Sequence, residues 1–81
     1  MAVNIAVIGA KGKLGQNICQ WSKEIANVES IVEIEKNTPI EQLNSDEIDL
    51  AIEVTNAHHV LANTKQLLAK SIPTIVGASG I

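Results

Sequence analysis

The sequence contains very few aromatic residues and little positive charge. It has one Trp and no Phe or Tyr among 81 residues, and its formal net charge is −3. Proteins that bind single-stranded nucleic acid need aromatic stacking platforms and a basic groove, and proteins that bind an anionic membrane surface need a basic face. The composition therefore argues against nucleic acid and against a membrane surface as the main partner.

Cysteine, signal-peptide features and long apolar runs are also scarce. Cys19 is the one cysteine, so a disulfide cannot form within the chain, which favours a reducing compartment. The first residues lack the basic segment and the apolar run that are typical of a signal peptide. No stretch approaches the roughly 18 to 20 apolar residues that span a membrane. We therefore expect a cytoplasmic protein.

The residues that are abundant are aliphatic. Hydrophobic residues make up 46% of the chain, and the predominance of Ile, Val, Leu and Ala among them suits a parallel sheet covered by helices. A chain of this length forms one small domain, which buries only about 60% of the surface that the unfolded chain exposes. We therefore expect a single domain over residues 1–81, with marginal stability.

Short β-branched runs alternate with helical patterns along the chain. We predict strands at 3–8, 30–34, 48–54 and 73–76, helices from 14 to near 27 and from about 58 to 70, and a short helical turn opened by Thr38 and Pro39. Such alternation predicts a parallel sheet with right-handed crossovers. The expected fold is a doubly wound α/β sheet of four strands, in the order 2-1-3-4, with a ligand crevice between the first and third strands.

Apolar residues at helical spacing predict which helix faces lie in the core. These are Leu14, Ile18, Trp21 and Ile25 in the first helix, and Val60, Leu61, Leu67 and Leu68 in the second. Trp21 is accordingly expected to pack in the core, and Cys19, at the border of the first stripe, to be a buried structural thiol. His58 and His59 are adjacent and diverge on a helix, so we expect a solvated helix start and no metal site.

The most informative stretch is a glycine-rich turn between the first predicted strand and helix. Gly9, Gly12 and Gly15 follow one another at three-residue spacing. Gly9 allows a tight turn, Gly12 lets the backbone approach a pyrophosphate, and Gly15 lets the helix pack close to the strand. A pyrophosphate then lies on the N–H groups of the helix N-terminus. The context indicates a Rossmann-like dinucleotide-binding turn, although the spacing is G-x-x-G-x-x-G and not G-x-G-x-x-G.

An acidic residue follows the turn at the distance that a nucleotide ribose requires. Glu35 comes about 20 residues after Gly15, at the end of the second predicted strand, and a carboxylate there accepts both ribose hydroxyls. Glu33 lies on the same face of that strand and is the alternative. Glu35 alone favours NADH, but Lys13 and Lys36 offset its repulsion of a 2′-phosphate. We therefore expect the chain to accept both NADH and NADPH.

Four stretches of the chain together resemble a known family. "IAVIGAKGKLGQNI", "VEIEK", "DLAIEVT" and "IVGASG" resemble the N-terminal domain of 4-hydroxy-tetrahydrodipicolinate reductase (dihydrodipicolinate reductase), an NAD(P)H enzyme of lysine and diaminopimelate biosynthesis. The resemblance implies cofactor-binding roles at matching positions. These positions are Gly9, Lys11, Gly12, Lys13, Leu14, Gly15, Glu35, Lys36, Val54, Thr55, Gly77, Ser79 and Gly80.

The resemblance also implies how these residues divide the cofactor among them. The glycine turn holds the pyrophosphate, with Lys13 near the phosphates, and Glu35 binds the adenine ribose. Val54 and Thr55 line the nicotinamide side, and the turn of residues 77–80 lies near nicotinamide and substrate. Relative to the family pattern, Glu53 replaces an Asp, Val54 an aromatic residue, Asn56 and Ala57 a proline-containing pair, and Ala78 and Ser79 two threonines.

Members of this family continue past the last glycine turn into a substrate domain that carries a His-His-x-x-Lys stretch. That stretch is not in these 81 residues, so we expect a cofactor-binding portion without catalytic residues of its own and without turnover by itself. The alternative is a non-catalytic module that binds or senses adenine dinucleotides. Apolar surface left exposed leads us to expect dimerisation or a need for cofactor to reach full stability.

Overall fold

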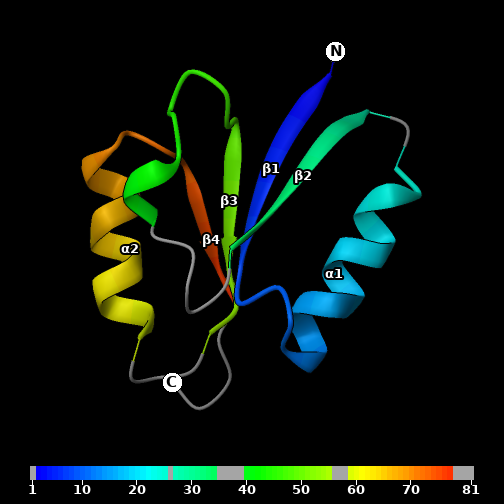
Figure 1. Cartoon of the computed structure of the whole chain (residues 1–81), viewed down its shortest axis with the longest axis horizontal. Coiled ribbons are helices and arrows are strands. Elements are labelled where there is room, and N and C mark those ends of the chain that lie inside the picture. The colour runs from blue at the N-terminus through cyan, green and yellow to red at the C-terminus, as the bar shows by residue number, and fades with distance from the viewer. Residues whose placement is uncertain (1, 26, 35–39, 56–58, 78–81) are drawn as a thin grey trace.

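The fold is seen in a computed structural model that describes residues 2–25, 27–34, 40–55 and 59–77 (Figure 1). Strands and helices alternate as the sequence predicts. The elements are β1 (Val3–Ile8), α1 (Lys13–Lys23), β2 (Val28–Ile34), the 3-10 turn η1 (Ile40–Gln42), β3 (Leu50–Glu53), α2 (Val60–Ala69) and β4 (Thr74–Val76). Thr38 and Pro39, which were expected to open the turn at η1, lie outside the described residues.

The four strands form one parallel sheet in the order β2-β1-β3-β4, which confirms the predicted topology. Ile8 pairs with Ile34 on one side and with Glu53 on the other, so the carboxyl ends of the central strands meet at one edge. The chain leaves β1 toward β2 and then returns to β3 on the other side. That reversal is the point at which doubly wound sheets form a ligand crevice.

Helices cover both faces of the sheet. Figure 1 shows α1 against one face and α2 with η1 against the other. The α2 face holds the larger core cluster: Ala6, Ile8, Ile34, Ile40, Leu43, Ile48, Ala51, Leu67 and Ile72. The α1 face holds Val7, Ala10 and Cys19, with Ile18, Ile31 and Val54 packed against them. β1 is thus buried on both sides, as its continuous apolar run predicts, and Cys19 is the buried thiol that was expected.

The predicted apolar stripe of α1 is wrong for three of its four residues. Leu14, Trp21 and Ile25 are 41%, 57% and 54% exposed. The stripe that faces the sheet consists of Gly15, Cys19 and Ser22, with Ile18 half-buried. The helix is rotated in this way because Gly15, which has no side chain, lies directly against the backbone of the preceding turn. Trp21 consequently lies at the surface and not in the core.

The predicted stripe of α2 is also only partly confirmed. Leu67 is fully buried, but Leu61 and Leu68 are 65% and 58% exposed. The inward stripe runs through Val60, Thr64 and Leu67 instead, at helical spacing. β4, the edge strand beside α2, also exposes Ile75 and Val76.

Element boundaries differ modestly from the predictions. α1 ends at Lys23, short of the predicted end near Asn27, and β2 begins at Val28, before the predicted start. β3 is shorter than predicted, but Val54 N–H still donates to the Ile8 carbonyl at 2.9 Å and so continues the ladder.

Within the described residues, no helix has the length and apolar character needed to cross a membrane.

Candidate functional site

The turn after β1 is hydrogen-bonded to the carboxyl end of β2. Gly9 has φ of +92°, which strongly favours glycine. Its N–H donates to the Ile34 carbonyl at 2.9 Å, and its own carbonyl accepts from Gly12 N–H at 3.1 Å. These bonds close a tight turn at the carboxyl edge of the sheet, next to the point where the strand order reverses.

Gly15 is required by the packing of α1 against this turn. A Cβ at Gly15 would lie 2.0 Å from the Gly9 carbonyl oxygen and 2.9 Å from the Ala10 Cα. Both are backbone atoms, so no side-chain movement can relieve the overlap. The first and third glycines of the motif are therefore explained by the fold alone: Gly9 by its backbone conformation and Gly15 by close approach.

Gly12 is different, because the fold does not require a glycine there. It is the N-cap of α1 with φ −67° and ψ 165°, an extended conformation open to any residue. A Cβ would meet its nearest neighbour, the Gly9 carbonyl oxygen, at 3.4 Å, an ordinary contact distance. The glycine therefore keeps the outer surface of the turn bare of side chain. That is the property needed where backbone approaches a pyrophosphate.

The N-terminus of α1 is suited to an anion. No side chain caps it in the described structure, and its first turn contains no acidic residue. The helical ladder begins where Gln16 N–H donates to the Gly12 carbonyl at 2.8 Å, so the N–H groups of the preceding helical residues are directed out of the helix end. Lys11 and Lys13 are exposed beside it. Dipole and lysine charge therefore both favour a phosphate at this position.

Gln16 is a residue of this turn that sequence reasoning missed. Its Nε2 donates to the Lys11 carbonyl at 2.8 Å, so the side chain ties the tip of the turn to the first turn of α1. A polar side chain directly after the third glycine is a weak signal in the sequence. Only the folded geometry brings it onto the loop backbone.

The turn after β3 lies against the glycine turn. A Cβ at Gly9 would meet the Val54 carbonyl carbon and the Thr55 methyl group, each at 3.1 Å. Gly77 N–H donates to the Glu53 carbonyl at 2.9 Å, and a Cβ at Gly77 would lie 3.4 Å from Val54 Cγ1. The structure thus brings Gly9, Val54, Thr55 and Gly77 together at the carboxyl edge of β1, β3 and β4.

A buried carboxyl group supports this second turn. Glu53 is 0% exposed, and its Oε1 accepts from Thr55 N–H at 2.6 Å and from the Thr55 hydroxyl. Its Oε2 is buried and has no hydrogen-bond partner among the described residues. Sequence reasoning noted Glu53 only as a replacement for Asp. An acid two residues before a Thr at a strand end was the available signal, because carboxylates bond backbone N–H groups in turns.

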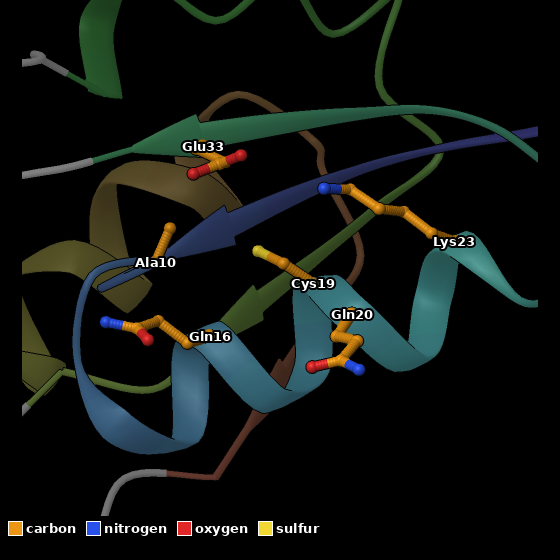
Figure 2. A pocket seen from close by; sticks show the side chains of 6 residues that line it. All are labelled: Ala10, Gln16, Cys19, Gln20, Lys23 and Glu33. Atoms are coloured by element: carbon orange, nitrogen blue, oxygen red, sulfur yellow. The ribbon is translucent and has the colours of Figure 1, made fainter.

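The flank of the glycine turn beside β2 forms an open depression of about 370 Å³, lined by Ala10, Gln16, Cys19, Gln20, Lys23 and Glu33 (Figure 2). Figure 2 shows Cys19 projecting from α1 toward the strands and Glu33 lying on β2 across from the helix. Glu33 is an exposed carboxylate on this flank. Glu35, Lys36, Ser79 and Gly80 lie outside the described residues, so their cofactor roles stay predictions.

The histidine pair gives no indication of a metal site where it is described. His59 is exposed and stands at the N-cap of α2, where its carbonyl accepts from Asn63 N–H at 3.0 Å. His58 lies outside the described residues. In the part of the chain that the structure covers, no three His, Cys, Asp or Glu side chains are grouped as metal ligands.

A glycine turn at the switch point of a parallel sheet with helices on both faces is the arrangement of a Rossmann-like domain. A family model described as dihydrodipicolinate reductase, N-terminus, matches residues 3–81. The chain therefore belongs to the family of dihydrodipicolinate reductase N-terminal domains, as the resemblance in its sequence predicts.

Curated relatives agree with this family assignment, and a solved structure shares the fold. The chain is 30% identical over 80 residues to 4-hydroxy-tetrahydrodipicolinate reductase of Corynebacterium aurimucosum and 29% identical over 80 residues to that of Nocardia farcinica. Each match covers 99% of this chain and 32% of the relative, so the chain spans about a third of their length. Aspartate semialdehyde dehydrogenase II of Vibrio cholerae has the same fold, with a TM-score of 0.81 over 98% of this chain and 31% of that one, at 12% identity.

Proposed function

We propose that this chain is the NAD(P)H-binding portion of a 4-hydroxy-tetrahydrodipicolinate reductase of lysine and diaminopimelate biosynthesis. Its family membership supports the enzyme class. The observation that carries the binding function is Gly12, a glycine that neither backbone strain nor packing within the described structure requires. A pyrophosphate that must come close to the backbone of the turn accounts for it.

We assign each group of proposed binding residues along the carboxyl edge of the sheet to one part of the cofactor. The pyrophosphate is bound by the N–H groups around Gly12 and the first turn of α1, with Lys11, Lys13 and Leu14 beside it. The adenine ribose is bound at the end of β2, by Glu35 with Glu33 as the alternative and Lys36 adjacent. The nicotinamide side is bound by Val54, Thr55, Gly77, Ser79 and Gly80. When bound, the cofactor supplies the hydride.

The contribution of residues 1–81 is to bind and orient the cofactor. Reduction also needs an acceptor held against the nicotinamide, and positioning of that kind is worth about 7 to 11 kcal/mol of the barrier. It further needs a proton donor and cations for a dicarboxylate substrate. We propose that these 81 residues do not provide them, so a steady-state assay with the imine substrate and NADPH is expected to show no enzymatic turnover.

A cofactor titration tests the binding function directly. The chain is titrated with NADH and with NADPH while the nicotinamide fluorescence is followed. We expect saturable binding of both, because Glu35 favours the ribose hydroxyls while Lys13 and Lys36 offset its repulsion of a 2′-phosphate. Absence of saturable binding of either cofactor up to millimolar concentration contradicts the proposal.

The acid at the end of β2 is tested by a pair of matched variants. Glu35→Ala is expected to weaken NADH more than NADPH, because hydrogen bonds from ribose hydroxyls to a carboxylate are worth roughly 1.5 to 3 kcal/mol. Glu33→Ala is the control and is expected to leave the ratio of the two affinities unchanged. If Glu35→Ala weakens both cofactors equally and Glu33→Ala changes the ratio, the ribose is bound by Glu33.

A further inference from the structure

We infer that Glu53 is a positioning residue, whose buried carboxyl group fixes Thr55 and thereby shapes the nicotinamide side of the cofactor crevice. This inference rests on the proposed function. Glu53 ends β3, where it pairs with Ile8 of β1 and Val76 of β4. It therefore stands between the two strands whose following turns carry Gly9 and Gly77.

The carboxyl group holds Thr55 at two points. Oε1 accepts from the backbone N–H of Thr55 and also from its hydroxyl. The first bond sets the path of the backbone out of β3, and the second sets the side-chain rotamer. Because Thr is branched at Cβ, fixing the hydroxyl also fixes the methyl group.

The methyl group of Thr55 points to the glycine turn. It lies 3.1 Å from the position that a Cβ would take on Gly9, at the same distance as the Val54 carbonyl group. One side of Thr55 is thus attached to Glu53 and the other is packed against Gly9. Movement of Thr55 therefore changes the surface between the turn after β1 and the turn after β3. This surface is the one that we assign to the nicotinamide half of the cofactor.

Stability of the fold gives no reason for an acid at this position. Glu53 is fully buried beside core residues Ile8 and Ala51, and its Oε2 lacks a partner among the described residues. Burying a polar group without a full set of hydrogen bonds is unfavourable. An apolar side chain of similar size would avoid the desolvation of Oε2, so the carboxyl group is explained by the two hydrogen bonds that it accepts from Thr55.

The test compares NADH with ADP-ribose, which lacks the nicotinamide. Binding of both ligands to the 81-residue chain is measured by calorimetry, together with thermal unfolding. Glu53→Leu is expected to weaken NADH about fivefold to tenfold and ADP-ribose less than about twofold. The unfolding midpoint is expected to stay the same or rise. Glu29→Gln, at an exposed position near the opposite end of the sheet, is the control and changes neither affinity.

Two variants of Thr55 separate its hydroxyl from its methyl group. Thr55→Val keeps the shape and the backbone N–H bond to Glu53 but removes the hydroxyl, so it is expected to weaken NADH in the same way as Glu53→Leu but to a smaller extent. Thr55→Ser keeps the hydroxyl and is expected to bind NADH more tightly than Thr55→Val. Since Glu53 acts through Thr55, the double variant Glu53→Leu/Thr55→Val is expected to bind NADH no more weakly than Glu53→Leu alone. Glu53→Asp, which keeps a carboxyl group, is expected to recover part of the affinity.

The outcomes distinguish this inference from the proposed function. If the wild-type chain binds neither NADH nor ADP-ribose, both fail. If it binds both, and Glu53→Leu weakens the two ligands equally or not at all, the inference alone is overturned. If Glu53→Leu does not fold, Thr55→Val decides the question, because an unchanged ratio of NADH to ADP-ribose affinity in that variant overturns the inference.

Discussion

The glycine turn has an inner part, where the fold requires glycine, and an outer part, where it does not. The inner part, Gly9 and Gly15, is packed against backbone, and a side chain at either position conflicts with the fold itself. The outer part, Lys11, Gly12 and Lys13, is exposed, and a Cβ at Gly12 meets only an ordinary contact. One motif thus combines two glycines that the fold requires with one glycine that the fold does not require.

The largest effect is expected for the inner substitution Gly15→Ala. Alanine ordinarily stabilises a helix by about 1 kcal/mol relative to glycine. Here the added Cβ would lie 2.0 Å from the Gly9 carbonyl oxygen, so α1 has to move away from the turn. We expect the free energy of unfolding to fall by about 3 kcal/mol, measured by urea or thermal unfolding.

The matched control for Gly15→Ala is Asn17→Ala, at an exposed position of the same helix. Because alanine has the higher helix propensity, this variant is expected to be slightly stabilised. If Gly15→Ala is also stabilised, the inner part of the turn is not set by close packing, and the distinction between inner and outer glycines is lost.

A smaller loss of stability is expected for Gly9→Ala. A left-handed backbone conformation is unfavourable for alanine by about 1 to 2 kcal/mol, and the Val54 and Thr55 contacts at 3.1 Å add strain. Thermal unfolding measures the change, with Gly77→Ala as the control, since its nearest contact is at 3.4 Å. A Gly9→Ala variant as stable as Gly77→Ala would refute the strained-turn account.

The smallest effect is expected at an outer position, for Lys13→Gln. Lys13 is exposed at the N-terminus of α1, so loss of its charge is expected to weaken NADH about twofold to fivefold without changing stability. The difference from wild type is expected to shrink as salt is raised, because salt screens exposed charges. Lys65→Gln on α2 is the control. An effect of Lys65→Gln equal to that of Lys13→Gln indicates a general charge effect.

The sequence was sufficient to predict the order of elements, the sheet topology and the glycine turn. β1 is a continuous apolar run, and the backbone conformation at Gly9 strongly favours glycine, so these features depend on local residue types. The exposed faces of α1 and α2 could not be predicted in this way. The spacing of apolar residues does not show that the close packing of Gly15 rotates α1. This rotation places Trp21 at the surface.

For a similar reason, some features of the candidate site could be predicted from the sequence and others could not. Gly9, Val54, Thr55 and Gly77 come together because they follow strands whose carboxyl ends meet at one edge, which topology alone predicts. The support given by Gln16 to the turn and by Glu53 to Thr55 arises from side-chain hydrogen bonds. Such contacts depend on atomic positions within the fold, and residue types and spacing do not specify them.

We propose that Gly12 is a glycine because a ligand approaches its backbone, and the Gly12→Ser variant separates this requirement from the requirements of the fold. Serine is a good N-cap residue and differs from glycine there by only a few tenths of a kcal/mol. We predict an unfolding midpoint equal to or above that of wild type, with NADH binding weakened at least about tenfold because the new Cβ obstructs the pyrophosphate. A stable Gly12→Ser variant that binds NADH as tightly as wild type would show that cofactor binding does not require a glycine at this position.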